Sequence, residues 1–169
     1  MDNQVNESTL ENSNQISRHD VKHLIFDLAS ERYGIPLSIV KEVISLSEIA
    51  PIPHVPKYLI GLINLRGSII TIIDLRMKLG LTSNEYIPKK TSIIITDIDN
   101  LTIGFVVDEV ADVVKIKSKQ VDNQISVQSK TSREYISGVA KMGDKKLALL
   151  LDIGKVLATS DLDIIRKVK

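Results

Sequence analysis

The sequence predicts a mainly β protein built from two small barrel-like subdomains of similar construction. Short runs rich in isoleucine and valine alternate with turn residues, a pattern typical of barrels and sandwiches. Two passages of the chain also resemble two later passages, about half the chain length further on. In both halves the order is the same: a tyrosine and a glycine, then a strand, an aspartate and a short helix. These pairs are Tyr58-Leu-Ile-Gly61-Leu62 with Tyr135-Ile-Ser-Gly138-Val139, and Ile72-Ile73-Asp74-Leu75 with Leu150-Leu151-Asp152-Ile153.

The composition excludes several classes of function. With 22 basic and 21 acidic residues among 169, the net charge is +1, so the chain lacks the basic surplus of proteins that bind nucleic acids or anionic membranes. Cysteine is absent, which excludes disulfides, thiolate metal sites and a cysteine nucleophile. No apolar run approaches the ~20 residues of a membrane span. We therefore expect a soluble, cytoplasmic protein without membrane insertion.

The first third of the chain predicts a tail followed by a hairpin. Residues 1–20 are rich in Asn, Gln, Ser and Glu and are expected to form a flexible tail. Residues 23–28 and 32–37 read as two strands around a short loop, and Pro36 should end the second strand because it lacks an amide donor. Residues 38–43 favour a helical turn capped by Ser38, followed by a weak strand at residues 44–49.

The central third contains the most informative stretch. Pro53 and Pro56 predict an extended entry, after which residues 57–63 can form a short apolar turn or helix. A corner at Asn64-Leu65-Arg66-Gly67 should follow, because Asn and Gly adopt left-handed backbone angles at low cost. The isoleucines of residues 68–73 predict a buried strand, and Asp74 should cap a helix that starts at Leu75.

The last third repeats this pattern. Residues 82–90 predict a loop, and residues 91–98 and 101–107 flank a two-residue turn at Asp99-Asn100. A strand is expected at residues 110–116, and a further hairpin at residues 135–142 and 146–151. Asp152 should cap a terminal helix at residues 153–157 that extends towards residues 164–165. The predicted domain covers residues 21–158, and residues 159–169 form a C-terminal helix or tail.

No residue pattern points to catalysis. The three histidines, His19, His23 and His54, match no metal-binding motif, so no metal site or other cofactor is predicted. Asp74 and Asp152 resemble an acid–base pair in composition alone, but each follows an apolar strand and precedes a helical pattern, which favours helix caps. Arg66 lies at a corner between apolar runs. Either it is a solvated surface arginine, or Glu42 provides a bidentate carboxylate beside a groove that Val40 faces.

The stretch from residue 52 to residue 76, I-P-H-V-P-K-Y-L-I-G-L-I-N-L-R-G-S-I-I-T-I-I-D-L-R, resembles the CheW family of chemotaxis coupling proteins. F-D-L-A-S-E-R-Y-G-I-P-L-S-I-V-K-E-V upstream and I-G-F-V-V-D-E-V-A-D-V downstream strengthen the resemblance. It covers roughly residues 22–157. It implies two SH3-like five-stranded β-barrels around a shared hydrophobic core, with terminal strands free to cross between them.

The resemblance also implies a function without catalysis. Members of this family bridge the cytoplasmic helical hairpin of a chemoreceptor and the regulatory domain of the chemotaxis histidine kinase, within membrane-associated receptor arrays. Apolar barrel ends are expected to contact the kinase, and the alternatives are a small-ligand-binding β-barrel or the same kind of adaptor in a non-chemotactic pathway. Motif positions implied in coupling are Val40, Glu42, Gly61 and Arg66, with Asn64, Leu65 and Gly67 shaping the corner.

Overall fold

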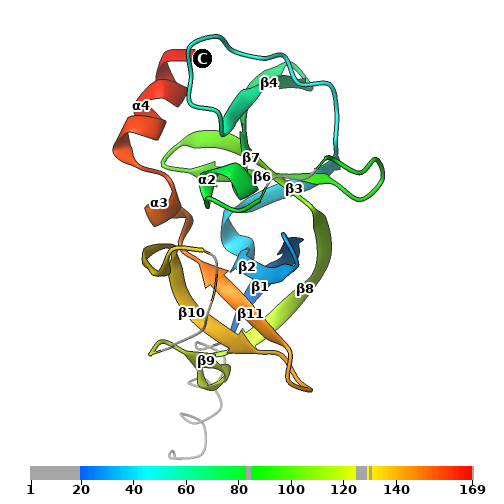
Figure 1. Cartoon of the computed structure of the whole chain (residues 1–169), viewed down its shortest axis with the longest axis vertical. Coiled ribbons are helices and arrows are strands. Elements are labelled where there is room, and N and C mark those ends of the chain that lie inside the picture. The colour runs from blue at the N-terminus through cyan, green and yellow to red at the C-terminus, as the bar shows by residue number, and fades with distance from the viewer. Residues whose placement is uncertain (1–19, 83–84, 125–128, 130, 169) are drawn as a thin grey trace, which may run out of the picture.

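The computed structural model describes residues 20–82, 85–124, 129 and 131–168. It consists of two β-barrels stacked along the long axis of the molecule (Figure 1). Barrel 1, in the lower half, is a six-stranded sheet in the order β8-β1-β2-β11-β10-β9, and barrel 2 is a five-stranded sheet in the order β3-β6-β7-β5-β4. The mainly β fold class and the two-barrel architecture are therefore confirmed, although barrel 1 has six strands where the resemblance implied five. The predicted tail lies outside the described residues, except that Asp20 is the first residue of β1.

Barrel 1 takes strands from both ends of the chain, whereas the strands of barrel 2 are consecutive. Barrel 1 contains β1 (Asp20–Leu28), β2 (Glu31–Pro36), β8 (Glu109–Lys117), β9 (Val121–Asp122), β10 (Ile136–Lys141) and β11 (Leu147–Leu151). Barrel 2 contains β3 (Val40–Ser45), β4 (Leu59–Leu65), β5 (Ser68–Asp74), β6 (Ser92–Ile98) and β7 (Leu101–Val107). The crossing of the terminal strands, which the sequence left open, places β1 and β2 beside β8 and β11.

The internal repeat is visible in the strand register. In barrel 2, β5 pairs in parallel with β7 and sets Ile72 beside Gly104. In barrel 1, β11 pairs in parallel with β2 and sets Leu150 beside Gly34. These matched registers make the two barrels related copies of one design, as the repeated sequence passages predicted.

The aspartates that follow the repeated strands occupy the same place in both barrels. The amide of Asp74 donates to the carbonyl of Tyr58 at 2.8 Å. In the other copy, the amide of Asp152 donates to the carbonyl of Tyr135 at 2.9 Å. Each bond ties the end of one strand to the residue before its neighbour, so the short helix that follows leaves both barrels at the same point.

A shared hydrophobic core joins the barrels, as expected. Its largest cluster combines side chains of both sheets, among them Phe26 and Tyr33 of barrel 1 and Phe105 of barrel 2. Two smaller clusters fill the individual barrels: one is lined by isoleucines of barrel 2, and the other surrounds Ile25 and Ile116 of barrel 1. Burial of this aliphatic surface is the main stabilising contribution, at about 25 cal/mol per Å2.

A partly buried ion pair lies where the barrels meet. Arg76, in the short helix α2 (Leu75–Lys78), contacts Asp108 through its Nε at 3.1 Å. The second carboxylate oxygen of Asp108 accepts the amide of Ala29, in the turn between β1 and β2, at 2.8 Å. The D-L-R and V-V-D-E-V segments therefore meet in space, and their charges connect barrel 2 to barrel 1.

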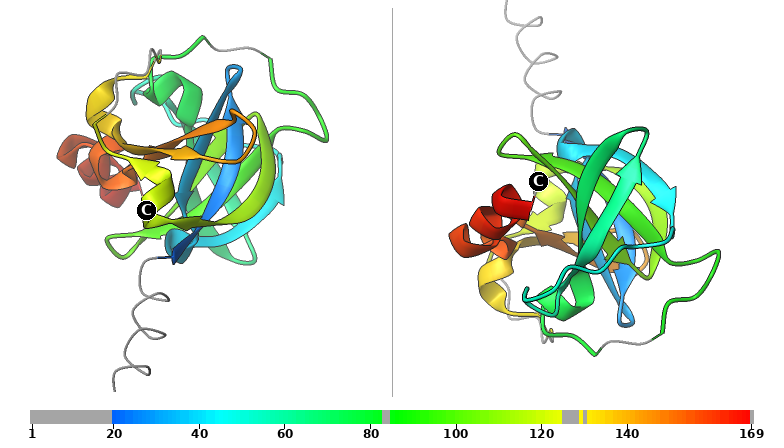
Figure 2. Two further views of the ribbon diagram at one scale, coloured as in Figure 1. Left: turned by 90° about the horizontal axis from the view of Figure 1, so that it is seen from below. Right: turned by 90° about the horizontal axis from the view of Figure 1, so that it is seen from above.

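Two helices at the C-terminus lie on one flank of the molecule. Figure 2 shows α3 (Ile153–Val156) and α4 (Thr159–Val168) on the same side in both views. The sequence predicted one terminal helix that extends towards residues 164–165, but the chain forms two, because Leu157 is extended and ends α3. Ile165 of α4 is fully buried in the shared core, so this second helix is a packed element.

Two local predictions were wrong. Residues 38–43 do not form a helical turn capped by Ser38: a 3-10 turn at Leu37–Ile39 has no side-chain cap and leads directly into β3. Residues 57–63 form no helix and are in a turn only at positions 57 and 58, because β4 takes up the rest and pairs with β5. In both cases a neighbouring strand supplies backbone partners that outweigh the local helix preference. Pro36 ends β2 as predicted.

Candidate functional site

The corner predicted at residues 64–67 is the tight turn that joins β4 to β5. Arg66 and Gly67 both have positive φ, at 51° and 87°, as a two-residue hairpin turn of this hand requires. The side-chain oxygen of Asn64 accepts the amide of Gly67 at 2.9 Å. The predicted segment is correct, but the left-handed backbone angle was expected at Asn64 and is found at Arg66. Asn64 instead stabilises the turn through its side-chain hydrogen bond to Gly67. Leu65 is half-buried and ends β4.

Arg66 forms the bidentate ion pair with Glu42 that its chemistry predicted. Its two terminal nitrogens donate to the two carboxylate oxygens of Glu42 at 2.8 and 3.0 Å. The arginine side chain is 74% exposed and the glutamate side chain 30%. Hydrogen bonding and charge attraction from Glu42 raise the pKa of the guanidinium. A cation is thus held at the surface in one orientation.

The ion pair spans the opening between the two edge strands of barrel 2. β3 and β4 are the outer strands of this sheet, and the pair lies over a groove of about 200 Å3 between them. Both polar and apolar side chains line its walls. The lining residues are Lys41, Glu42, Leu65, Arg66, Ser68, Ile70, Ile95 and Thr102.

Gly61 lies inside β4, away from the turn. The register with β5 shifts between Leu59 and Gly61, which marks a bulge, and Gly61 has φ of +152°. A Cβ atom here would lie 2.2 Å from the carbonyl oxygen of Ala50. Ala50 exchanges two main-chain hydrogen bonds with Leu62, of 2.8 and 2.9 Å. Gly61 therefore permits the contact that closes barrel 2.

Val40 is separate from this groove. It begins β3, pairs with Thr96 and packs against the shared core. The register shift that follows leaves Lys41 without a partner on β6 and aligns Glu42 with Ile95. The structure thus brings Glu42, Leu65 and Arg66 together at one opening, while Val40 and Gly61 support it from the strands beneath.

Sequence reasoning missed a buried polar cluster that surrounds Asp161. This carboxylate is 1% exposed and accepts hydrogen bonds from Lys78 Nζ at 2.7 Å, from the amide of Ala158 at 2.9 Å and from the hydroxyl of Tyr58. The Lys78 ammonium also lies 4.3 Å from the centre of the Tyr58 ring. Asp161 stands three residues after Ala158 at the start of α4, where an acidic residue reads as an ordinary helix start, so the pattern gave no sign of its long-range partners.

Ionisation of this cluster is set by two opposing effects. Burial alone would raise the pKa of Asp161, but the hydrogen bonds from Lys78 and Tyr58 outweigh it and lower that pKa. Burial likewise opposes the charge of Lys78, while the bond to Asp161 raises the lysine pKa. Both groups are therefore charged at neutral pH, and α4 is attached to barrel 2 by a desolvated ion pair.

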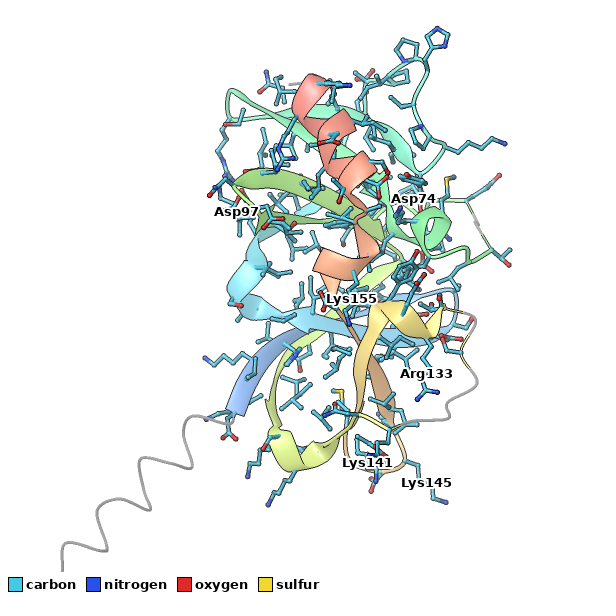
Figure 3. All side chains as sticks on the ribbon, turned by 90° about the vertical axis from the view of Figure 1, so that its left-hand side faces the viewer. Asp74, Asp97, Arg133, Lys141, Lys145 and Lys155 are labelled. Atoms are coloured by element: carbon cyan, nitrogen blue, oxygen red, sulfur yellow. The ribbon has the colours of Figure 1, made fainter. Side chains whose placement is uncertain are left out.

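The two aspartates considered as an acid–base pair do not share a cavity. Asp74 is fully buried, accepts the amide of Met77 at 3.2 Å and accepts the Tyr86 hydroxyl at 2.5 Å, so it caps α2 as predicted. Asp152 precedes α3, but its side chain makes no capping bond; it lines a groove that Asp74 does not reach. Figure 3 shows Asp74 beside α2.

Two further features bear on the class of function. Within the described residues, no three His, Asp or Glu side chains gather closely enough to hold a metal ion. No helix among these residues has the length and apolarity needed to cross a membrane. The fold is a two-barrel scaffold, and its candidate site is a fixed cation beside a groove at the edge of barrel 2.

This scaffold matches a known protein family. The family model described as CheW-like domain matches residues 22–161. Chemotaxis protein CheW of Klebsiella aerogenes is 32% identical over 145 residues, covering 86% of each chain. Chemotaxis protein CheW of Treponema pallidum is 32% identical over 143 residues, covering 81% of this chain and 82% of the relative.

A solved structure agrees with the sequence comparison. The crystal structure of the scaffolding protein TtCheW from Thermoanaerobacter tengcongensis superposes with a TM-score of 0.74 at 30% identity, covering 83% of this chain and 90% of that one. The chain described here belongs to the CheW-like family. The resemblance predicted from its motifs is therefore confirmed, and the matched region includes all seven predicted site residues.

Proposed function

We propose that this protein is a chemotaxis adaptor that couples the cytoplasmic helical hairpin of chemoreceptors to the regulatory domain of the chemotaxis histidine kinase. It carries out no chemistry of its own and works in the cytoplasm, recruited to receptor arrays. In this proposal it binds no nucleic acid and does not insert into membranes. Residues 21–158 form the coupling domain in this proposal, with residues 1–20 as a tail and residues 159–169 as a C-terminal helix or tail.

The observation that carries this proposal is the Glu42–Arg66 pair. A bidentate partner fixes an arginine that is otherwise exposed, and it does so at the mouth of a groove between two edge strands. Pre-orientation lowers the entropy cost of binding a partner. An arginine fixed in this way suits an acidic side chain on a helical partner, with apolar contacts from Leu65 beside it. The names of the family's chemotaxis relatives support the same role.

Two alternatives remain from the sequence. A small-ligand-binding or enzymatic barrel needs polar groups that converge on one pocket, and Asp74 and Asp152 are engaged in separate places. An adaptor of the same family in a non-chemotactic pathway would use the same surfaces with a different receptor. Partner identity, and not the fold, separates this second alternative from the main proposal.

The test is a pair of binding titrations, one with a chemoreceptor cytoplasmic fragment and one with the regulatory domain of the chemotaxis kinase. Each compares wild type with Arg66→Glu. Lys145→Glu serves as a matched control, because Lys145 is a cation with φ of 58° in the corresponding turn of barrel 1. Lys145 lies at the far end of the molecule from barrel 2 (Figure 3).

We expect wild type to bind both partners. Arg66→Glu should lower the affinity for the receptor fragment by at least about tenfold, the equivalent of ~1.4 kcal/mol. The Lys145→Glu control should bind the receptor fragment as wild type does. Equal receptor binding by wild type and Arg66→Glu would remove Arg66 from the receptor surface. Failure of wild type to bind either partner would contradict the proposed function itself.

A further inference from the structure

Strand β4 is fixed at both ends by side-chain contacts. Tyr58 directly precedes its first residue, and Arg66 directly follows its last. The hydroxyl of Tyr58 donates to Asp161 in α4, whereas Arg66 binds Glu42 in β3. Because β4 is an outer strand of its sheet, these end contacts replace part of the support that a second neighbouring strand would give. The candidate site thus lies at one end of a strand that α4 holds at the other.

The contact at the Arg66 end marks a difference between the barrels. β3 and β8 carry the same register shift, which makes Asp112 the counterpart of Glu42. Asp112 does not reach across the barrel opening: it accepts the amide of the adjacent Val113 at 2.7 Å. The ion pair across the opening is therefore a feature of barrel 2.

The contact at the Tyr58 end is a second difference between the barrels, and it also concerns barrel 2. α2 and α3 are equivalent helices, but α2 is followed by a loop at residues 79–82, whereas α3 is followed by α4. α4 crosses from the end of barrel 1 to barrel 2 along the flank seen in Figure 1. Its carboxylate binds Lys78 on α2 and Tyr58 before β4. Both departures from the repeat therefore act on one strand.

We propose that Asp161 is a positioning residue for the coupling surface. Through Tyr58 and Lys78 it fixes the start of β4, and this fixed strand holds the Arg66 turn in the geometry that binds a receptor. Its effect on partner binding rests on the proposed function. The mechanical link between Asp161 and β4 concerns this chain alone and can be measured without a partner.

The first measurement is hydrogen exchange of the full chain. Asp161→Asn keeps the shape of the side chain and removes the charge that Lys78 binds. The matched control is Asp163→Asn on the same helix, since Asp163 is exposed and pairs only weakly with Arg166 at 3.6 Å. We expect Asp161→Asn to accelerate exchange of the amides of β4 and its turn about tenfold more than it accelerates exchange of the amides of β1 and β2. The control should exchange as wild type does.

A second, milder variant tests the same link if Asp161→Asn does not fold. Tyr58→Phe removes one hydroxyl and leaves the Lys78–Asp161 pair in place, so it should accelerate exchange in the same amides to a smaller degree. Wild-type exchange of β4 in folded Asp161→Asn and Tyr58→Phe would overturn the positioning role. Equal acceleration in every strand would also overturn it, because that outcome indicates a general loss of stability.

The second measurement connects the positioning role to the receptor. Asp161→Asn should weaken binding of the receptor fragment about tenfold, and this effect should vanish in an Arg66→Glu background because both changes act through one turn. A merely structural effect would instead add to that of Arg66→Glu. If wild type binds no receptor fragment, the proposed function fails, while the exchange measurement still decides whether Asp161 fixes β4.

Discussion

Gly61 and Gly138 occupy the same place in the two barrels, and each admits the segment that closes its barrel. Both lie at a register shift in the strand that follows a repeated tyrosine. A Cβ on Gly61 would meet the carbonyl oxygen of Ala50 at 2.2 Å, whereas one on Gly138 would meet Cγ1 of Val121 at 2.6 Å. The first obstacle is backbone and the second is the end of a side chain.

This difference predicts unequal costs for the same substitution. Gly61→Ala should lower the free energy of unfolding by about 3 kcal/mol, because it combines a backbone clash with a left-handed φ. Gly138→Ala should cost about 1 kcal/mol, since Val121 can change rotamer. Urea denaturation of both variants measures the two values. Similar costs at the two positions would contradict the closure role assigned to Gly61.

The two aspartates that precede short helices should also differ. Asp74→Ala removes a carboxylate that caps α2 and binds Tyr86, so we expect a loss of about 2 kcal/mol. Asp152→Ala removes a side chain with no capping bond and should change stability by less than about 0.5 kcal/mol. Thermal denaturation of the two variants at neutral pH gives the comparison. A larger effect at Asp152 would show that its side chain has a role the helix start does not explain.

Acid should weaken the attachment of α4. The pKa of Asp161 is lower in the folded protein than its ordinary value of 3.8, so below pH 3.8 the unfolded chain binds more protons than the folded chain does. The stability from this group is therefore present above pH 3.8 and is lost as pH falls through the lower, folded value. Breaking the pair with Asp161→Asn should cost about 3 kcal/mol at pH 7.

The measurement is urea denaturation of wild type and Asp161→Asn at several pH values. The gap between them should narrow as pH falls below 3.8, because wild type then also loses its carboxylate charge. Asp163→Asn provides the control and should follow wild type at every pH. A gap that stays constant from neutral to acidic pH would mean that the charge of Asp161 does not contribute.

The turn beside the candidate site offers a test that separates folding from binding. Gly67 and Gly143 both have positive φ, at 87° and 68°, and a Cβ at either position meets open space. Replacing either by alanine should therefore cost about 1 kcal/mol of backbone strain. Only Gly67→Ala should weaken receptor binding, because it reshapes the turn that carries Arg66. Equal binding by the two variants would place the receptor surface elsewhere.

Elements with a local signal were predictable from sequence. Turn residues at Asp99-Asn100 and the strand-ending Pro36 gave hairpins and boundaries correctly, because their backbone preferences act within a few residues. The Glu42–Arg66 pair could also be predicted, since an arginine between apolar runs needs a carboxylate. The motif resemblance then supplied the family and the two-barrel architecture.

Elements decided by distant parts of the chain were not predictable. β4 became a strand because β5 and Ala50 supply its backbone partners, although residues 57–63 alone also suit a helix. The parallel pairing of β2 with β11 joins strands from opposite ends of the chain, and no local pattern encodes it. The long-range partners of Asp161 escaped notice for the same reason: its neighbours in sequence describe only a helix start.

The crossing of the terminal strands determines the order in which the two barrels can fold during synthesis on the ribosome. Barrel 2 uses residues 40–107 and can pair all its strands as soon as these have emerged. Strands β1 and β2 are made before barrel 2, yet their partners β8 and β11 are made after it. The earliest strands therefore wait for the latest, and barrel 1 can close only after barrel 2 is complete.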